Sequence, residues 1–343
     1  MGVGHAAETG ALMDQKSELT AILGKARAFW EARILMTAAE IDVFSLLLDT
    51  PKTSGQVSLE LSSDQRATEA LLNALVALGL LLKTEHTFRV RPGFERVLSN
   101  SAPETVLPVI RHMAQLWDSW GQLTEIVRKG KVTRSVEDLE RDEAGVRAFI
   151  GAMHTIGLGL ARGVVARLDL SGRRHLIDVG GGSGVYTIAV LQAAPEMRAT
   201  IFDRPPVTEI ARQKLVEEGL TDRVELVNGD FYVDALPDGH DLALLSAIIH
   251  QNDAEQNIEL YRKVFGALVP GGTVVVRDFV MSEDHTEPPD GAFFAINMLV
   301  NTPGGSTYSF EDISKDLEAA GFADARLLHR GEMDSLVTAR KPE

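Results

Sequence analysis

Apolar residues in the first part of the chain recur three and four positions apart. From Ser17 to Leu48 this spacing makes one apolar stripe, which is typical of helices that pack against a core or a partner. After an interruption at Pro51 to Thr53, residues 57–61 and 68–82 predict two helices joined by a polar turn. Residues 86–90 predict a short strand. This order of elements outlines a winged helix.

The helical spacing continues as far as Leu170. Trp117, Trp120, Leu123 and Val127 are predicted to share one helix face, and residues 149–165 to form an apolar, glycine-containing helix. No stretch is expected to span a membrane, because the apolar runs are short or interrupted by charged residues.

Beyond Leu170 short apolar runs alternate with helical stretches. Strands are expected at 175–179, 198–203, 224–227, 242–245, 272–277, 325–328 and 335–339, and helices at 187–193, 207–218, 258–268, 292–300 and 309–320. Strands that alternate with crossover helices indicate an α/β domain with a mostly parallel, doubly wound sheet of seven strands.

A glycine-rich segment joins the first of these strands to the next helix. It runs from Asp178 through Gly180, Gly181, Gly182 and Ser183 to Gly184. Glycines allow a tight turn and a close approach of the backbone to a ligand. Asp203 ends the next strand, nineteen residues after Gly184, where a carboxylate can accept hydrogen bonds from ribose hydroxyls. Both features predict a site for a nucleoside-containing cofactor.

The glycine pattern departs from that of dinucleotide-binding proteins. The third glycine of their fingerprint is missing, since Val185 or Thr187 stands in its place, and no Gly-Lys-Ser/Thr follows. Asp178 would repel a pyrophosphate but suits the α-ammonium group of a methionine moiety. An NAD-dependent dehydrogenase is therefore disfavoured.

The second half of the chain resembles class I S-adenosylmethionine (SAM)-dependent methyltransferases. The whole chain resembles the small-molecule O-methyltransferases of plants and bacteria, such as acetylserotonin and polyketide O-methyltransferases, which carry a winged-helix dimerisation domain. The residues that carry the resemblance lie in six segments: 178–184, 202–205, 229–231, 247–250, 268–272 and 301–305.

The resemblance implies three regions and a Rossmann-like catalytic domain. A mainly helical, winged-helix-like dimerisation domain is expected at 1–100, a helical linker that contributes to the substrate pocket at 101–170, and the SAM-binding domain at 171–343.

The resemblance also assigns the cofactor contacts. Gly180 and Gly182 would line the methionine end of SAM, Asp203 would hold the ribose, Asp230 would accept from the adenine amino group, and Phe231 would pack on the ring. Ser246, which stands where plant members have a lysine, is placed in the same site, as is Asp178.

His250 is the candidate general base. It ends an apolar strand, 242–249, at the edge where open α/β sheets bind ligands, and an unperturbed imidazole of pKa ~6.5 is largely neutral near pH 7. A phenol of pKa ~10 is only about 0.1% ionised near pH 7, so a positioned base can raise the rate of transfer up to about a thousandfold. Asp278, at the end of the next strand, matches the acid that orients this histidine in plant members. The alternatives are a histidine that caps the strand and an acid in a solvated turn.

Three positions besides Ser246 depart from the family pattern. Gln251 and Asn252 replace the usual Asp-Trp after the histidine, and Phe310 replaces a second acid of the plant enzymes. These changes leave open that catalysis rests on positioning alone.

The substrate pocket is expected to be apolar. Met298, Asn301, Trp117 and Met153 are its candidate lining residues, although methionines and aromatics at helical spacing are also typical of a core. The histidines show no metal-ligand spacing, so no metal is expected.

Charge and composition restrict the partners. The formal net charge of −15 opposes binding to nucleic acid or anionic membranes, and the Gln65–Glu69 segment offers a single arginine to DNA. The chain has no cysteine, which fits a reducing compartment, and residues 1–16 do not resemble a secretory signal. A cytoplasmic location is therefore expected.

The prediction is a homodimeric, SAM-dependent O-methyltransferase of secondary metabolism that acts on a hydroxyl of a small aromatic or polycyclic molecule. Three alternatives stay open: methyl transfer to carbon or nitrogen, SAM binding without transfer, and a winged-helix transcription factor.

Overall fold

The computed structural model describes residues 18–102, 104–130 and 143–343. The chain divides into two compact units, Met1–Ala114 and Gln115–Glu343. The predicted helical linker, 101–170, extends across this division. The N-terminal segment that was searched for a secretory signal lies outside the described residues.

The first unit combines helices with a small antiparallel sheet. Residues 18–27 are helical, and the elements that follow are α2 (Phe29–Glu40), α3 (Val43–Leu46), β1 (Lys52–Thr53), α4 (Ser54–Glu60), α5 (Gln65–Ala77), β2 (Leu81–Thr84), β3 (Thr87–Val90) and α6 (Leu107–Gln115). The strands have the order β1-β3-β2 and are antiparallel. This arrangement confirms the winged-helix outline.

Capping and packing residues explain the ends of these helices. Thr53 closes a capping box with Gln56 at the start of α4, and Asp64 caps α5 by accepting from Ala67 N at 2.8 Å. The prediction of one helix over 68–82 was wrong at its end. Gly79 adopts φ +75° after α5, and the chain then enters β2, where Leu81 is buried.

The second unit begins with three helices, α7 (Trp117–Gly121), α8 (Leu123–Lys129) and α9 (Glu143–Val165). The prediction that Trp117 and Val127 share one helix face was wrong, because the helix is interrupted at Gln122, between α7 and α8. By length and composition alone, α9 could cross a membrane over Gly145–Val165, which was not expected. It carries Arg147 and Arg162 and packs against α10 and α11.

A seven-stranded sheet forms the centre of the second unit. In chain order its elements are β4 (His175–Val179), α10 (Val185–Ala193), β5 (Arg198–Asp203), α11 (Pro205–Glu217), β6 (Val224–Asn228), β7 (His240–Ser246), α12 (Ala254–Ala267), β8 (Leu268–Asp278), α13 (Pro289–Asn301), α14 (Phe310–Ala319), β11 (Ala323–His329) and β12 (Ser335–Arg340). The strand order is β11-β12-β8-β7-β4-β5-β6. The five strands from β8 to β6 are parallel, and β12 and β11 are antiparallel to their neighbours.

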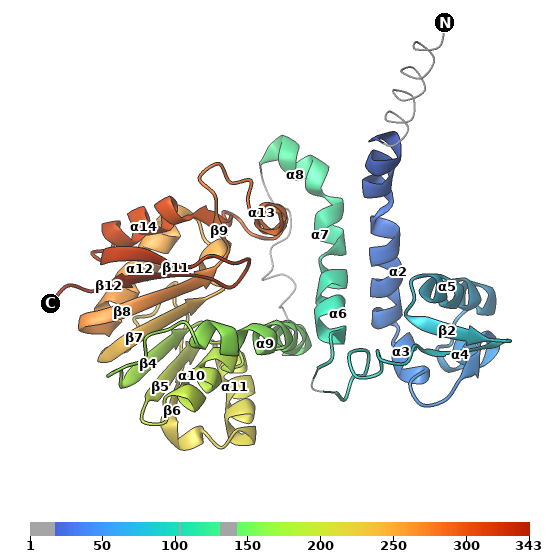
Figure 1. Ribbon diagram of the computed structural model, residues 1–343, viewed down its shortest axis with the longest axis horizontal. Helices are drawn as coiled ribbons and strands as arrows, with labels where there is room; N and C mark the ends of the chain where they lie inside the picture. Colours follow the sequence, from blue (N-terminus) through green and yellow to red (C-terminus); the bar gives the residue numbers. More distant parts are fainter. Residues whose placement is uncertain (1–17, 103, 131–142) are drawn as a thin grey trace, which may run out of the picture. The chain divides into compact units, whose positions relative to one another are not determined.

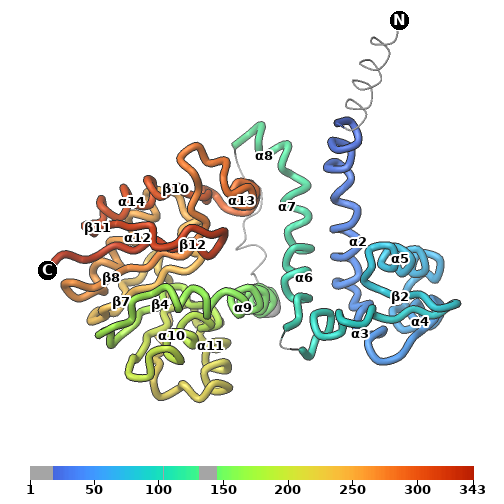
Figure 2. Tube along the Cα trace, in the orientation of Figure 1, coloured from blue at the N-terminus to red at the C-terminus, as the bar shows by residue number. Residues whose placement is uncertain are grey.

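Helices cover both faces of this sheet (Figures 1 and 2). Alternate residues of β4 enter different cores: Leu176 packs with α9, α10 and α11, whereas Ile177 and Val179 pack with α12 and α14. This central strand therefore buries both of its faces, as expected for a doubly wound sheet. The mostly parallel α/β fold that the sequence predicted is confirmed.

Candidate functional site

The order of the strands places a switch point between β4 and β7. From β4 the chain proceeds through β5 to β6, then returns to the other side of β4 to form β7 and β8. Crossovers that leave in opposite directions open a crevice at the carboxyl ends of the central strands, where such folds bind ligands. The glycine loop, Asp203, Asp230, His250 and Asp278 all follow or end strands at this edge.

The glycine loop turns through left-handed conformations. Gly180, Gly182 and Gly184 have φ of 68°, 59° and 77°, which other residues rarely adopt. Gly182 N donates to Asp203 Oδ2 at 2.9 Å, so the acid after β5 holds the loop after β4. Nothing lies within 4 Å of a Cβ built on Gly182, which leaves open space on that side of the loop.

Asp178 lies under this loop. Its side chain is buried, and Thr187 Oγ1 donates to Oδ2 at 2.6 Å. A Cβ on Gly181 would lie 3.0 Å from its carboxyl carbon, so a larger residue there would have to displace the acid. Burial raises the pKa of Asp178 to about 6, with a smaller contribution from the charge of Asp203.

A buried arginine, which the sequence analysis overlooked, lies beside this acid. Arg277 is 3% exposed, donates to the hydroxyl of Tyr186 and lies over its ring at 4.9 Å. Its charge lowers the pKa of Asp178 and so opposes part of the effect of burial. Ser246, opposite Arg277 in the register of β7 and β8, has a buried hydroxyl beside that of Tyr186. The sequence feature that could have identified Arg277 is a charged residue within an apolar strand.

His154 is a second residue that the sequence analysis did not select. It extends from α9, and its Nδ1 lies 2.8 Å from Ser183 Oγ in the glycine loop. Burial lowers the pKa of His154. The neutral ring can thus pair with the serine, which ties α9 to the loop.

The loop after β6 carries Asp230 and Phe231. Asp230 Oδ1 accepts from Tyr232 N at 2.8 Å, and the rings of Phe231 and Tyr232 are 4.6 Å apart. Lys263 of α12 donates to the main-chain oxygens of Phe231 and Tyr232 at 2.8 and 2.9 Å. This loop approaches the glycine loop, because a Cβ on Gly180 would lie 3.5 Å from the Phe231 ring.

His250 lies in a short 3-10 turn, η3 (Ile249–Gln251), and not at the end of a strand. The expectation that its strand reaches Ile249 was wrong. β7 ends at Ser246, and Ala247 then takes a left-handed conformation with φ 59°. This turn directs the chain across the edge of the sheet.

The structure brings His250 and Asp278 together. His250 Nδ1 lies 2.9 Å from both carboxylate oxygens of Asp278. The side chain of Asp278 is 2% exposed and that of His250 is 12% exposed, and Phe279 N also donates to the carboxylate. An ionised carboxylate only accepts, so Nδ1 carries the proton and Nε2 keeps its lone pair. Nε2 makes no hydrogen bond to the described residues.

Two of the four predicted substrate residues belong to α13, the helix whose Phe294 contacts His250. The ring of Phe294 in α13 packs on the edge of His250 at 4.9 Å, and Met298 is buried one turn further along α13. Asn301 ends α13 and donates from Nδ2 to Asn297 Oδ1 at 3.0 Å, while its own Oδ1 is buried without a partner in the described residues.

Trp117 and Met153 extend from other helices of the same unit. Trp117, 36% exposed, belongs to α7, and Met153 is half-buried on α9. Trp120, also on α7, donates from Nε1 to Asn297 Oδ1 at 3.0 Å. Because indole only donates, this contact fixes the orientation of the Asn297 amide, and through it that of Asn301.

The described residues contain no cluster of three or more His, Asp or Glu side chains arranged to hold a metal ion. The polar groups at the sheet edge instead pair with one another, as in His250–Asp278 and Gly182–Asp203.

Comparisons with known proteins agree with this geometry. The model of the O-methyltransferase dimerisation domain matches residues 24–102, and that of the O-methyltransferase domain matches residues 120–323. The chain is 31% identical over 312 residues to a 3-hydroxy-5-methyl-1-naphthoate 3-O-methyltransferase of Streptomyces sahachiroi, covering 90% of both chains. It is 31% identical over 329 residues to the tetracenomycin polyketide synthesis 8-O-methyl transferase of Streptomyces glaucescens, covering 94% of this chain and 96% of that one.

A solved structure is similar over nearly the full chain. PigF with S-adenosylhomocysteine has a TM-score of 0.87 at 26% identity, covering 94% of this chain and 99% of that one. The glycine loop, His250 and Asp278 all fall within the second matched region.

Proposed function

The chain belongs to the O-methyltransferase family with an N-terminal dimerisation domain, and on this premise we propose that His250 deprotonates a hydroxyl of a small aromatic or polycyclic acceptor. Membership makes it a SAM-dependent O-methyltransferase. The site suits that cofactor: the loop is open beside Gly182, and a buried acid lies under it.

The contact between His250 and Asp278 carries the proposal. When bound, SAM supplies a methyl group that its sulfonium already activates. Asp278 accepts a hydrogen bond from Nδ1–H of His250 and so leaves the Nε2 lone pair to take the proton of the acceptor hydroxyl. The buried carboxylate at 2.9 Å then stabilises the imidazolium that forms.

The cofactor contacts follow from the sheet edge. We assign the methionine end to Gly180 and Gly182, with the negative charge of Asp178 beneath it, and the ribose to Asp203. Asp230 and Phe231 are assigned to adenine. Ser246 is placed at the base of the same crevice, beside Tyr186.

The acceptor is proposed to lie beside α13, between His250 and the other helices of the unit. Met298 and Met153 would supply apolar contacts, Trp117 an aromatic wall, and Asn301 Oδ1 an acceptor for a second polar group. The relatives named above act on a hydroxynaphthoate and in polyketide synthesis, so hydroxynaphthoates and polycyclic phenols are the first acceptors to test.

The test of the base is the rate of S-adenosylhomocysteine release with such an acceptor. His250→Gln should lower kcat about 10²–10³-fold near pH 7. The loss should shrink as pH rises, by about tenfold per unit, because the acceptor then ionises without help. Asp278→Asn should lower kcat less than His250→Gln does, since an amide oxygen can still accept a hydrogen bond from Nδ1.

Calorimetry with S-adenosylhomocysteine is the control for this experiment. His250→Gln should bind it as the unmodified protein does. A variant with full activity near pH 7 would show that positioning alone drives the transfer and would remove the general-base role.

The same titration tests the ribose assignment. Asp203→Ala should weaken S-adenosylhomocysteine binding at least about tenfold, since it removes the carboxylate and frees Gly182 N. Asp222→Ala, at an exposed acid in the same unit, is the matched control. Equal affinity of the two variants would contradict the assignment.

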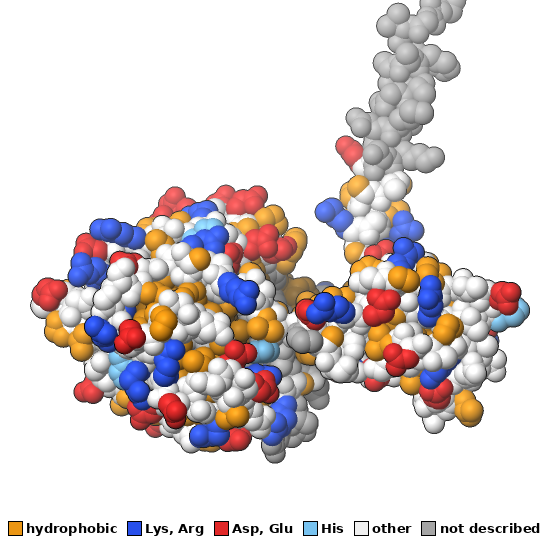
Figure 3. Space-filling model, turned by 60° about the horizontal axis from the view of Figure 1, so that its bottom comes forward, with side chains coloured by type: hydrophobic (Ala, Val, Ile, Leu, Met, Phe, Trp, Pro, Cys, Tyr) orange, Lys and Arg blue, Asp and Glu red, His pale blue; other side chains and the backbone are white. Residues whose placement is uncertain are grey.

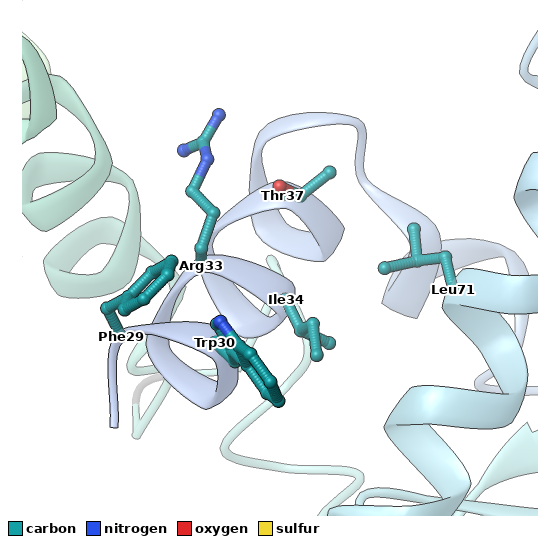
Figure 4. Close-up of a pocket in the computed structure, with 6 residues that line it drawn as sticks. All are labelled: Phe29, Trp30, Arg33, Ile34, Thr37 and Leu71. Carbon is teal, nitrogen blue, oxygen red and sulfur yellow. The ribbon is translucent and has the colours of Figure 1, made fainter. Parts of the chain in front are cut away.

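We propose further that the protein is a homodimer, because residues 24–102 match the dimerisation domain. On α2, Phe29, Trp30 and Ile34 line a groove with Leu71 of α5, and Leu71 points toward α2 (Figure 4). Phe29 and Trp30 are each about half exposed. We propose that a second copy covers this apolar face.

The remaining partners are assigned from charge. On the face shown in Figure 3, acidic and basic side chains are interspersed over the surface of the second unit. With a net charge of −15, we propose a cytoplasmic enzyme of secondary metabolism that acts on a small molecule, without a nucleic acid or membrane partner.

A further inference from the structure

Asn252, two residues after His250, is fully buried. Its side-chain Oδ1 accepts from Tyr232 Oη at 2.6 Å, and its Nδ2 donates to Asn257 Oδ1 at 3.0 Å. Tyr308 Oη donates to its main-chain oxygen. This residue therefore joins the loop after β6 to the turn that carries His250.

The direction of these hydrogen bonds is fixed at one end. Asn257 Nδ2 lies 3.1 Å from the main-chain oxygen of Ile249, which can only accept. Asn257 Oδ1 must then accept from Asn252 Nδ2, and Asn252 Oδ1 must accept from the Tyr232 hydroxyl. The result is a single directed relay from Tyr232 to the residue before His250.

The members of the relay differ in their exposure to solvent. Asn252 and Asn257 are buried, whereas Tyr232 is 43% exposed and its ring lies against Phe231. Both ends are attached to α12, because Lys263 holds the main chain at Phe231 and Tyr232, and Asn257 belongs to the first turns of the helix. The exposed tyrosine is the part that a ligand packed on Phe231 can restrain.

We propose that Tyr232, Asn252 and Asn257 are positioning residues that couple occupation of the adenine site to the placement of His250. This inference rests on the proposed function, which assigns adenine to Asp230 and Phe231 and the base to His250. Adenine against Phe231 confines the Phe231–Tyr232 ring pair and keeps the hydroxyl on Asn252. The hydrogen bonds from Tyr232 through the buried pair Asn252 and Asn257 then transmit that restraint to Ile249.

Hydrogen exchange with S-adenosylhomocysteine tests the coupling without an acceptor. In the unmodified protein, the ligand should slow amide exchange in residues 229–234 and in residues 247–252. Tyr232→Phe should keep the first effect and reduce the second at least about threefold, because only the link to Asn252 is broken. Asn257→Ala, which breaks the last link, should give the same result.

Tyr308→Phe is the matched control. It removes a tyrosine hydroxyl from the same asparagine but leaves the side-chain relay intact, so ligand protection of 247–252 should persist. Protection of 247–252 that is equal in Tyr232→Phe and in the unmodified protein overturns the coupling. So does a loss of protection in Tyr308→Phe equal to that in Tyr232→Phe, which would indicate general loosening of the turn.

Calorimetry separates this inference from the proposed function. If the unmodified protein binds S-adenosylhomocysteine but shows no protection at 247–252, the coupling is wrong and the cofactor site stands. If it does not bind the ligand at all, the cofactor assignments fail and the coupling fails with them.

Discussion

At the scale of single residues, Asp178 is a carboxyl group whose ionisation opposes folding. Its pKa is raised from 3.8 to about 6 by burial. The unfolded chain therefore ionises first, and stability falls as pH rises from about 4 to about 6. The full effect, about 3 kcal/mol as an order of magnitude, is present at neutral pH. Such a cost at the proposed methionine site is consistent with a charge kept for a cationic ligand.

Asp178→Asn should therefore stabilise the protein without ligand. The amide oxygen can still accept from Thr187, and no charge is buried. Thermal unfolding should show a higher Tm than the unmodified protein near pH 7.5, with a difference that vanishes toward pH 4. A variant that is less stable at both pH values would show that attraction to the charge of Arg277 outweighs the cost of burying the carboxylate.

The same residue should make cofactor binding depend on pH. An ammonium group prefers the ionised acid, so affinity for S-adenosylhomocysteine should weaken up to about tenfold between about pH 7.5 and pH 5. In Asp178→Asn the affinity should be low and nearly independent of pH. Calorimetry across this range measures the affinity of both proteins as a function of pH. The same pH dependence in both would show that Asp178 does not contact the ligand.

Single residues were predictable from the sequence where a local motif carries them. The glycine loop and Asp203 stand in a recognisable strand–loop–helix pattern, and the structure joins them through Gly182 N. Arg277 and Tyr186 were not predictable in this way, because they lie far apart in the chain and meet only through the order of the strands.

At the scale of elements, the turn η3 depends on the segment that follows α13. Ser306 N donates to His250 O at 2.9 Å, and a Cβ on Gly305 would lie 2.5 Å from that oxygen. Gly305→Ala must therefore move the turn or the segment. We expect destabilisation of about 1–3 kcal/mol and a fall in kcat of at least about tenfold.

Gly266→Ala is the control for this substitution. It lies on α12 with nothing within 4 Å of the new Cβ, so it should stabilise the helix by about 0.5–1 kcal/mol and leave kcat unchanged. Denaturant titration and initial rates of both variants compare the two effects. Normal activity in Gly305→Ala would mean that the turn tolerates displacement of its support.

Periodicity located the elements of the sheet but not their ends. The seven strands of the sheet lie where apolar runs predicted them, and the central strands β4 and β7 bury both faces between helices. The end of β7 differed because Ala247, a residue with no sequence signal for it, adopts φ 59°. The break between α7 and α8 likewise has no signal in the local sequence, and both short helices contact α13.

At the scale of the whole molecule, the apolar surface of α2 bears on how many copies assemble. Trp30 is 54% exposed in the chain, which is unusual for so large an apolar side chain, and it lines the groove with Ile34 and Leu71. The helical residues 18–27, which precede α2, also expose apolar side chains: Leu19 is 57% exposed and Ile22 is 65% exposed. Burial of such a stripe against its copy would remove these apolar side chains from water.

Trp30→Glu should therefore convert the dimer to a monomer. A charge in the groove would have to be desolvated on association, which is costly without a partner. Light scattering should give twice the chain mass of 37.3 kDa for the unmodified protein and the single mass for the variant. Leu59→Glu, at a residue 80% exposed on α4 outside the groove, should stay dimeric. Because every proposed cofactor residue lies in the second unit, the monomer should still bind S-adenosylhomocysteine. A dimer that persists in Trp30→Glu would place the interface elsewhere on the chain.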